Sequence, residues 1–177
     1  MTGAVRRRKG AVASGTPLVH DEPMSSNHEI KPVESFSEEN REVVEVLRGS
    51  DVEARLDVLE EVGEADDELA LELLRLLESD APEELRAAVA IALGPTLEIM
   101  DTEVNDEGRI DNPLGMAPLS QEVYDRVTDT LRRVCLDEGQ PVLLRRRAFE
   151  AAVRSPKRWH EEVIRSAWAG TDPDWRL

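Results

Sequence analysis

An arginine that recurs at a fixed interval, near the start of successive helical segments, most constrains what this chain can fold into. Arg55, Arg86, Arg145 and Arg176 each follow a helix-starting signal, and the first and last intervals between them are both 31 residues. The middle interval is 59 residues, close to two periods. A helical period of about 30 residues is typical of stacked helix pairs. The sequence therefore predicts an all-α solenoid of antiparallel helix pairs, about three and a half of them.

Helix-forming residues dominate the 177-residue chain, and aromatic residues make up only 3% of it. Straight-chain residues and alanine lose little freedom in a helix. Apolar residues at helical spacing predict helices over about 38–48, 52–62, 67–79, 83–94, 121–136, 141–154 and 157–169. The predicted capping residues are Ser37, Asp51, either Asp66 or Asp67, and Ser120. In stacked pairs the odd-numbered helices of this series would form a convex layer and the even-numbered ones a concave layer.

Two segments fall outside this helical pattern. Residues 1–35 mix small, polar and charged side chains without periodicity, which predicts a disordered tail carrying the basic cluster Arg6–Lys9. Residues 102–119 are rich in turn formers and charges, which predicts an irregular insertion between repeats. Gly94-Pro95 should break or kink the helix before that insertion, because proline cannot donate to the helical ladder. The predicted solenoid thus covers residues 36–177.

The C-terminal end is expected to hold an incomplete repeat. The predicted helix 157–169 is apolar at Trp159 and Trp168, among others, but the segment that would pair with it is reduced to Trp175 and Leu177. An uncapped end of a helix stack exposes apolar surface. We therefore expect either that the chain is the N-terminal part of a longer protein, or that self-association covers this end.

Three segments carry a resemblance to a known family. Leu85–Gly94, Arg145–Val153 and Asp172–Leu177 resemble the second helices of HEAT repeats, particularly the short bacterial HEAT-like type. The resemblance covers residues 36–177, approximately the whole predicted solenoid. In that family an aspartate in the turn pairs with an arginine six residues later, which implies a pair between Asp80 and Arg86. HEAT-like proteins include scaffolds, transport factors, chromophore-attaching proteins and DNA-repair enzymes, so the resemblance implies a fold rather than one activity.

The charge of the chain is strongly negative and unevenly distributed. The formal net charge is -16, residues 33–119 alone carry a local net charge of -19, and residues 120–177 are nearly neutral. This acidity disfavours nucleic acid and anionic membranes as partners, and it favours basic partners or serves solubility. The single cysteine, Cys135, and the lack of a membrane-spanning apolar run predict a cytoplasmic protein without disulfides.

Charged residues on the concave-layer helices are the candidate binding residues. Three carboxylates lie on the polar side of the predicted helix 52–62. Two arginines and one glutamate lie at i, i+4 and i+8 on the predicted helix 141–154. The candidate partner-binding residues are Glu53, Asp57, Glu60, Arg146, Glu150 and Arg154. Ordinary helix solvation with weak i,i+4 pairs explains these positions equally well, so both interpretations stay open.

Catalytic, cofactor and metal motifs are missing from the sequence. The acidic run after Asp101 fails the calcium-loop pattern, since Asp106 and Asn112 occupy the glycine and glutamate places. Cys135 lies among apolar residues, which predicts a buried and unreactive thiol. We therefore predict a non-catalytic protein–protein interaction scaffold or adaptor without catalytic residues, cofactor or metal. The alternatives are a HEAT-like enzyme, nucleic-acid-linked or chromophore-attaching, and a structural subunit of a larger assembly.

Overall fold

The computed structural model describes residues 33–105, 107–111 and 117–153, together with residues 160, 161, 164, 165 and 169. These residues form seven helices within one unit, Lys31–Leu177. The helices are α1 (Val33–Arg48), α2 (Val52–Glu60), α3 (Asp67–Leu77), α4 (Glu83–Ala92), α5 (Gly94–Glu103), α6 (Gln121–Leu136) and α7 (Val142–Ala152). The described part of the chain contains no strand beyond one isolated bridge, so the all-α prediction is confirmed.

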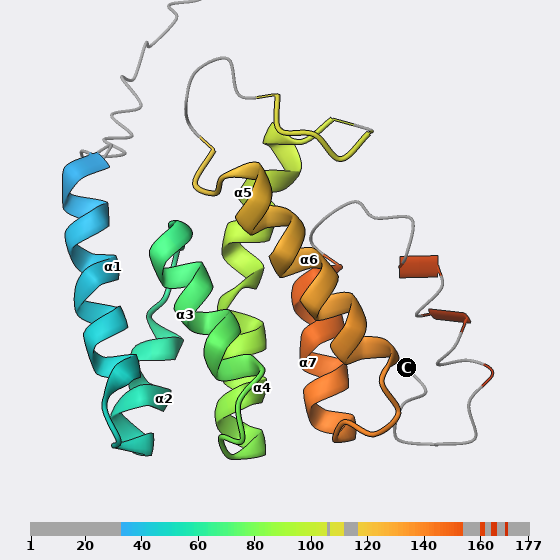
Figure 1. Cartoon of the computed structure of the whole chain (residues 1–177), viewed down its shortest axis with the longest axis horizontal. Coiled ribbons are helices and arrows are strands. Elements are labelled where there is room, and N and C mark those ends of the chain that lie inside the picture. The colour runs from blue at the N-terminus through green and yellow to red at the C-terminus, as the bar shows by residue number, and fades with distance from the viewer. Residues whose placement is uncertain are drawn as a thin grey trace, which may run out of the picture. The chain divides into compact units, whose positions relative to one another are not determined.

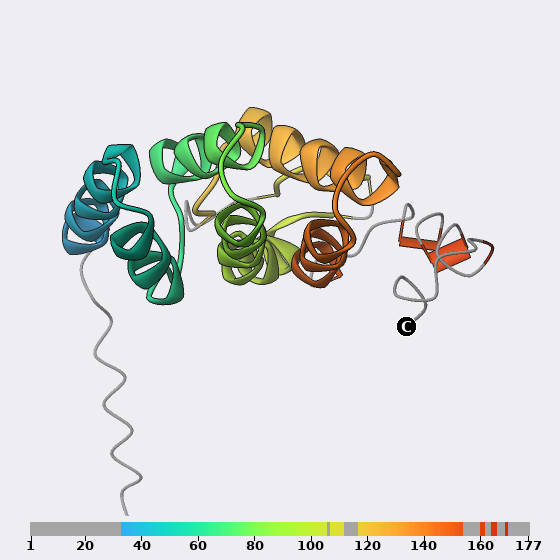
Figure 2. The same ribbon diagram turned by 90° about the horizontal axis from the view of Figure 1, so that it is seen from below.

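The helices lie in two layers, as Figures 1 and 2 show. One layer contains α1, α3 and α6, and the other contains α2, α4 and α7. Each helix of the first layer packs against the next helix in the chain, and neighbours within a layer also touch. The helix α5 packs against α4 and α7. The described helices with odd places in the predicted series, α1, α3 and α6, thus share one layer, and the helices that follow them share the other. The predicted helix 157–169 and the predicted incomplete repeat after it lie largely outside the described residues.

The helix α3 forms the centre of the core because it contacts α1, α4 and α6. Its apolar side chains at Leu69, Leu73, Leu74 and Leu77 are fully buried. Leucine fills such a wide arc only where a helix has neighbours on several sides. Leu71 lies outside this buried set, because its side chain is 37% exposed.

Local signals define the starts of three helices. The Asp51 carboxylate accepts from the backbone N–H groups of Glu53 and Ala54, at 3.0 and 3.3 Å. Asp66 caps α3 in the same way, and Ser120 caps α6. These side chains satisfy N–H groups that lack a partner in the first helical turn. The three predicted caps are confirmed.

The start of α1 differs from the prediction. The helix begins at Val33, so the predicted cap Ser37 lies inside it and the predicted tail 1–35 ends three residues too late. Serine costs little inside a helix, so Ser37 is compatible with a place in the second turn of α1. Residues 1–32 lie outside the described residues, so the prediction that they are disordered stays untested.

The expected break at Gly94-Pro95 is confirmed. The helix α4 ends at Ala92 and α5 begins at Gly94, with Pro95 in the first turn, where its missing N–H costs nothing. The described residues after α5 are irregular, as predicted, although α5 itself runs two residues into the predicted insertion, to Glu103.

A tight turn follows α5. An isolated antiparallel bridge joins Val104 to Ile110, and Gly108 adopts a φ of 80°, which favours glycine. The Asn105 side-chain oxygen accepts hydrogen bonds from two backbone N–H groups inside the turn. The Gln121 side chain accepts from the Ile110 N–H at 2.8 Å, which fastens the turn to the start of α6.

Candidate functional site

Three of the recurring arginines close the ends of first-layer helices, and the fourth, Arg176, lies outside the described residues. Arg86 donates from Nε to the Leu77 carbonyl at 2.9 Å, and Arg145 donates from Nε to the Cys135 carbonyl at 3.1 Å. Arg55 donates to the Gly49 carbonyl, directly after α1. The last carbonyls of a helix lack internal partners and form the negative end of its dipole, so a cation stabilises them. Each of these three arginines therefore joins its second-layer helix to the helix before it.

The predicted pair between Asp80 and Arg86 is not formed. Asp80 is exposed, and Arg86 bonds instead to the Leu77 carbonyl and, through Nη2, to the Gln140 side-chain oxygen at 2.9 Å. A backbone carbonyl at the helix end lies nearer to the guanidinium than the carboxylate in the turn does. The bond to Gln140 also links α4 to the turn that precedes α7.

These arginines give α2, α4 and α7 a common register. Residues two before, two after and five after each arginine are exposed or half-exposed, whereas most positions between them on α4 and α7 are buried. We call this set the second-layer face. Its members are Glu53, Asp57 and Glu60 on α2, Glu84, Ala88 and Ile91 on α4, and Leu143, Arg147 and Glu150 on α7.

The chemistry of the second-layer face changes from helix to helix. The three positions on α2 are exposed carboxylates, and none of them forms an ion pair with a described residue. The positions on α4 include a half-exposed alanine and Ile91, which is 38% exposed. On α7 the Leu143 side chain is 40% exposed. The face thus passes from acidic on α2 to partly apolar on α4 and α7.

The structure separates the candidate residues into two groups, because α4 packs between α2 and α7. Glu53, Asp57 and Glu60 share the exposed side of α2, as their spacing predicted. Arg146 is exposed too, but Glu150 is half-buried and pairs with Arg147 at 2.5 Å, so the predicted i, i+4 row on α7 is replaced by an i, i+3 pair. Arg154 lies outside the described residues.

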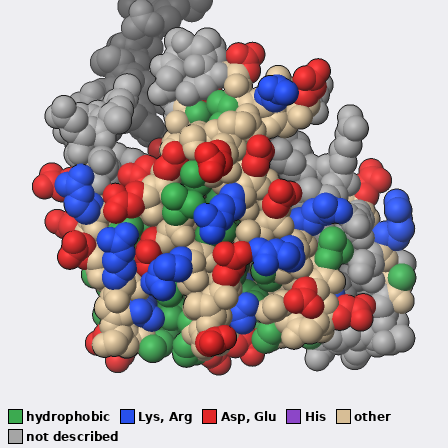
Figure 3. All heavy atoms as spheres, viewed as in Figure 1, with side chains coloured by type: hydrophobic (Ala, Val, Ile, Leu, Met, Phe, Trp, Pro, Cys, Tyr) green, Lys and Arg blue, Asp and Glu red, His purple; other side chains and the backbone are tan. Residues whose placement is uncertain are grey.

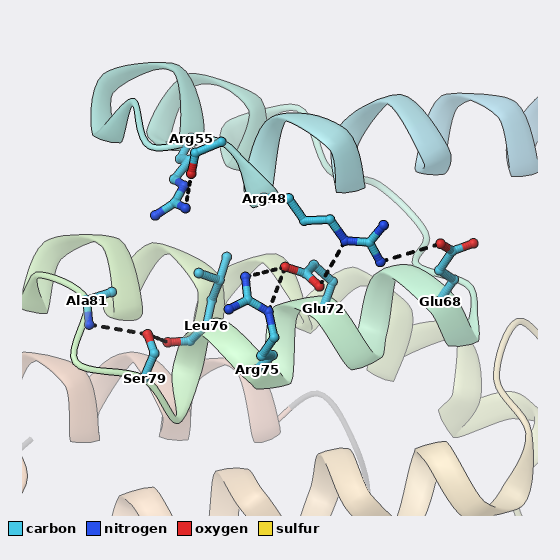
Figure 4. A network of polar contacts seen from close by, with 9 residues as sticks. Arg48, Arg55, Glu68, Glu72, Arg75, Leu76, Ser79 and Ala81 are labelled. Carbon is cyan, nitrogen blue, oxygen red and sulfur yellow. Dashed lines mark hydrogen bonds and ion pairs between the residues drawn. The ribbon is translucent and has the colours of Figure 1, made fainter.

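Sequence reasoning missed a buried carboxylate between α1 and α3. Glu72 is 5% exposed, and it accepts hydrogen bonds from Arg75 Nε at 2.9 Å and from Arg48 Nε at 3.5 Å. Figure 4 shows these contacts, with Glu68 on the other side of Arg48 at 3.7 Å. Burial raises the pKa of the Glu72 carboxyl, but the two guanidiniums outweigh burial and hold this pKa below its usual range.

The available signal for this site was the position of Glu72 inside the leucine stripe of α3, three residues before Arg75. Its partner Arg48 belongs to another helix and could not be assigned from spacing. The cluster bridges two helices and satisfies a buried charge, which is a structural role.

Paired charges cover the outer side of the first layer. Glu78, the residue directly after α3, pairs with Arg133 and, at 3.8 Å, with Arg126, both on α6. Figure 3 views the molecule from the side on which α3 and α6 lie in front of α4 and α7, and it shows basic and acidic side chains interleaved there. This layer therefore compensates its acidic residues on α3 with arginines, and the α2 part of the second-layer face does not.

Cys135 offers no reactive group. Its side chain is fully buried, and burial raises the pKa of the thiol to about 12. The sulfur is 3.7 Å from the Arg145 carbonyl oxygen. A neutral buried thiol is a poor nucleophile and metal ligand. The prediction of a buried, inert thiol is confirmed. No set of three or more metal-ligating side chains gathers within the described ranges.

The fold and these contacts define an all-helical protein of two packed layers. Comparisons with known proteins add no relative, since no protein-family model, no curated protein and no solved structure matches the chain. Within the described residues, every helix is too short or too polar to cross a membrane.

Proposed function

We propose that this chain is a HEAT-like α-solenoid that binds another protein through its second-layer face, as a non-catalytic scaffold or adaptor. Two observations support the repeat architecture. The arginines at equal places in α2, α4 and α7 make the same kind of contact to the preceding helix end. Each helix pair also packs directly against the next pair. Repetition of one contact in successive pairs is what a repeat protein requires.

The single observation that carries the binding role is the exposed apolar surface of the second layer. Seven large apolar side chains are exposed among the described residues, and four of them lie on second-layer helices or directly after one: Val52, Ile91, Leu143 and Val153. Ile91 and Leu143 are members of the second-layer face. A scattered apolar residue needs no explanation, but such residues on adjacent helices beside unpaired charges are typical of protein interaction surfaces. Net charge of -16 makes a protein partner more favourable than nucleic acid or an anionic membrane. We place this role in the cytoplasm as part of the same proposal.

A pull-down from the source lysate tests this role with matched variants. In one variant Ile91→Glu and Leu143→Glu place charges on the second-layer face. In the control, Val46→Glu and Leu71→Glu place the same charges on first-layer side chains, both 37% exposed. Circular dichroism verifies that both variants remain folded.

We expect the wild-type chain and the control to retain the same discrete protein and the face variant to lose it. Retention by all three chains, or no retained protein at all, would contradict the proposal.

A further inference from the structure

The proposed binding face has a chemistry that selects one kind of partner, so this inference rests on the proposed function. The outer carboxylates of α2, Glu53, Asp57 and Glu60, follow one another at i, i+4 and i+7 and span about 10 Å along the helix. The only cation of α2 is Arg55, and its guanidinium is held by the Gly49 carbonyl. Nothing on α2 therefore neutralises this row.

The neighbouring helix adds exposed apolar side chains, because α2 packs against α4. At the register positions of Asp57 and Glu60, the helix α4 presents Ala88, which is half-exposed, and Ile91, which is 38% exposed. A row of charge next to a row of apolar side chains matches a partner element with one charged side and one apolar side.

The charges on α7 disfavour a partner segment with acidic side chains. Arg147 is paired with Glu150, which leaves Arg146 as the exposed cation of α7 without a described ion pair. An acidic segment would therefore gain one contact on α7, whereas a basic segment would gain three on α2. Charge complementarity thus favours a basic occupant.

We propose that the surface formed by α2 and α4 binds an amphipathic, basic segment of a partner protein. Lysine or arginine side chains of that segment contact Glu53, Asp57 and Glu60, and its apolar side chains pack on Ala88 and Ile91. The carboxylates select the partner by charge, and the apolar strip fixes its position.

Fluorescence anisotropy with the full chain and a labelled 14-residue helical peptide of lysine and leucine tests this proposal. The counter-probe is the same peptide with glutamate in place of lysine. The test variant carries Glu53→Gln, Asp57→Asn and Glu60→Gln. The control carries Glu38→Gln, Glu42→Gln and Glu45→Gln, which removes three exposed carboxylates at the same spacing from α1, where Arg41 lies among them.

We expect the lysine peptide to bind the wild-type chain, and the α2 variant to weaken that binding about tenfold at physiological salt. The α1 control should weaken it less than about twofold, and the additional change Ile91→Ala should weaken it further. Equal losses in the two triple variants would overturn the proposal, because they would indicate general attraction to an acidic protein.

Two other results would overturn the inference while the proposed function is decided separately. Tighter binding of the glutamate peptide than of the lysine peptide would indicate an acidic partner segment instead of a basic one. Absence of binding by either peptide would exclude a basic segment as the occupant. In both cases the pull-down with the Ile91 and Leu143 variant still decides whether the second-layer face binds a protein at all.

Discussion

Arg145 is the most deeply buried of the arginines that close helix ends, with 6% of its surface exposed. Its guanidinium donates to the Cys135 carbonyl at the end of α6. A buried hydrogen bond from a charged group contributes more than a neutral one, and its loss leaves the carbonyl without a donor. At the scale of single residues, this position should therefore matter far more than its equally charged neighbours.

We expect Arg145→Met to lower the free energy of unfolding by about 2–4 kcal/mol, because it removes a buried charged donor while keeping most of the apolar volume. Urea denaturation followed by circular dichroism measures this change. Arg146→Met, at the exposed neighbouring position, is the control and should stay within about 0.5 kcal/mol of the wild type. Similar losses of unfolding free energy in both variants would show that the contact to the Cys135 carbonyl does not stabilise the fold.

Glu72 should make stability depend on pH. Its pKa in the folded protein lies below the ordinary value of a glutamate, so the stabilisation is present above that ordinary value and is lost as the pH falls through the folded pKa. We therefore expect the wild type to lose more stability than Glu72→Gln between pH 7 and about pH 3. Subtracting the stability loss of Glu72→Gln from that of the wild type cancels the contribution of the other carboxylates.

Urea unfolding at the two pH values provides this measurement. Glu68→Gln serves as the control, since the Glu68 carboxylate is exposed and its ion pair with Arg48 is long, at 3.7 Å. This variant should keep the pH response of the wild type. An identical pH response in the wild type and Glu72→Gln would contradict the assigned role of the buried cluster.

At the scale of elements, the helices that could be predicted were those with a local start signal. Asp51, Asp66 and Ser120 act within three residues of their own position, so sequence alone locates them. The start of α1 could not be located in this way, because Ser37 is equally compatible with a cap and with an early helical turn. The acceptor of Arg86 was also missed, because the end of α3 competes with the nearby Asp80.

The first helix pair should be the least stable part of the described chain. The helix α2 buries only Leu59. Among its described side chains, α1 buries Val44, Leu47 and Asn40, and the Asn40 side-chain nitrogen has no hydrogen-bond partner. The helix α3 buries seven side chains. Local opening is easiest where few apolar contacts must be broken.

Amide hydrogen exchange with mass spectrometry checks this expectation. We expect amides of α1 and α2 to exchange at least about tenfold faster than those of α3, α4 and α6 under native conditions. Uniform protection across all five helices would indicate instead that the described part of the chain opens only as a whole.

At the scale of the whole molecule, the recurring arginine predicted which helices share a layer, because a repeat places equivalent helices at equivalent positions. The α2 members of the candidate site could be predicted as well, since helical periodicity determines which residues share a side. The remaining members could not, because the pairing of Glu150 with Arg147 and the insertion of α4 between α2 and α7 depend on packing. The apolar contribution of Ile91 and Leu143 became visible only from their exposure.

Site-specific photo-crosslinking in the source lysate shows whether a partner contacts the second-layer face, as we propose. A photoreactive amino acid replaces Ile91 in one chain and Leu71 in another, two side chains of nearly equal exposure in different layers, at 38% and 37%. We expect a discrete crosslinked protein from position 91 and none from position 71. A crosslinked protein from position 71 alone, equal crosslinking from both positions, or none from either would show that partners do not bind through the second-layer face.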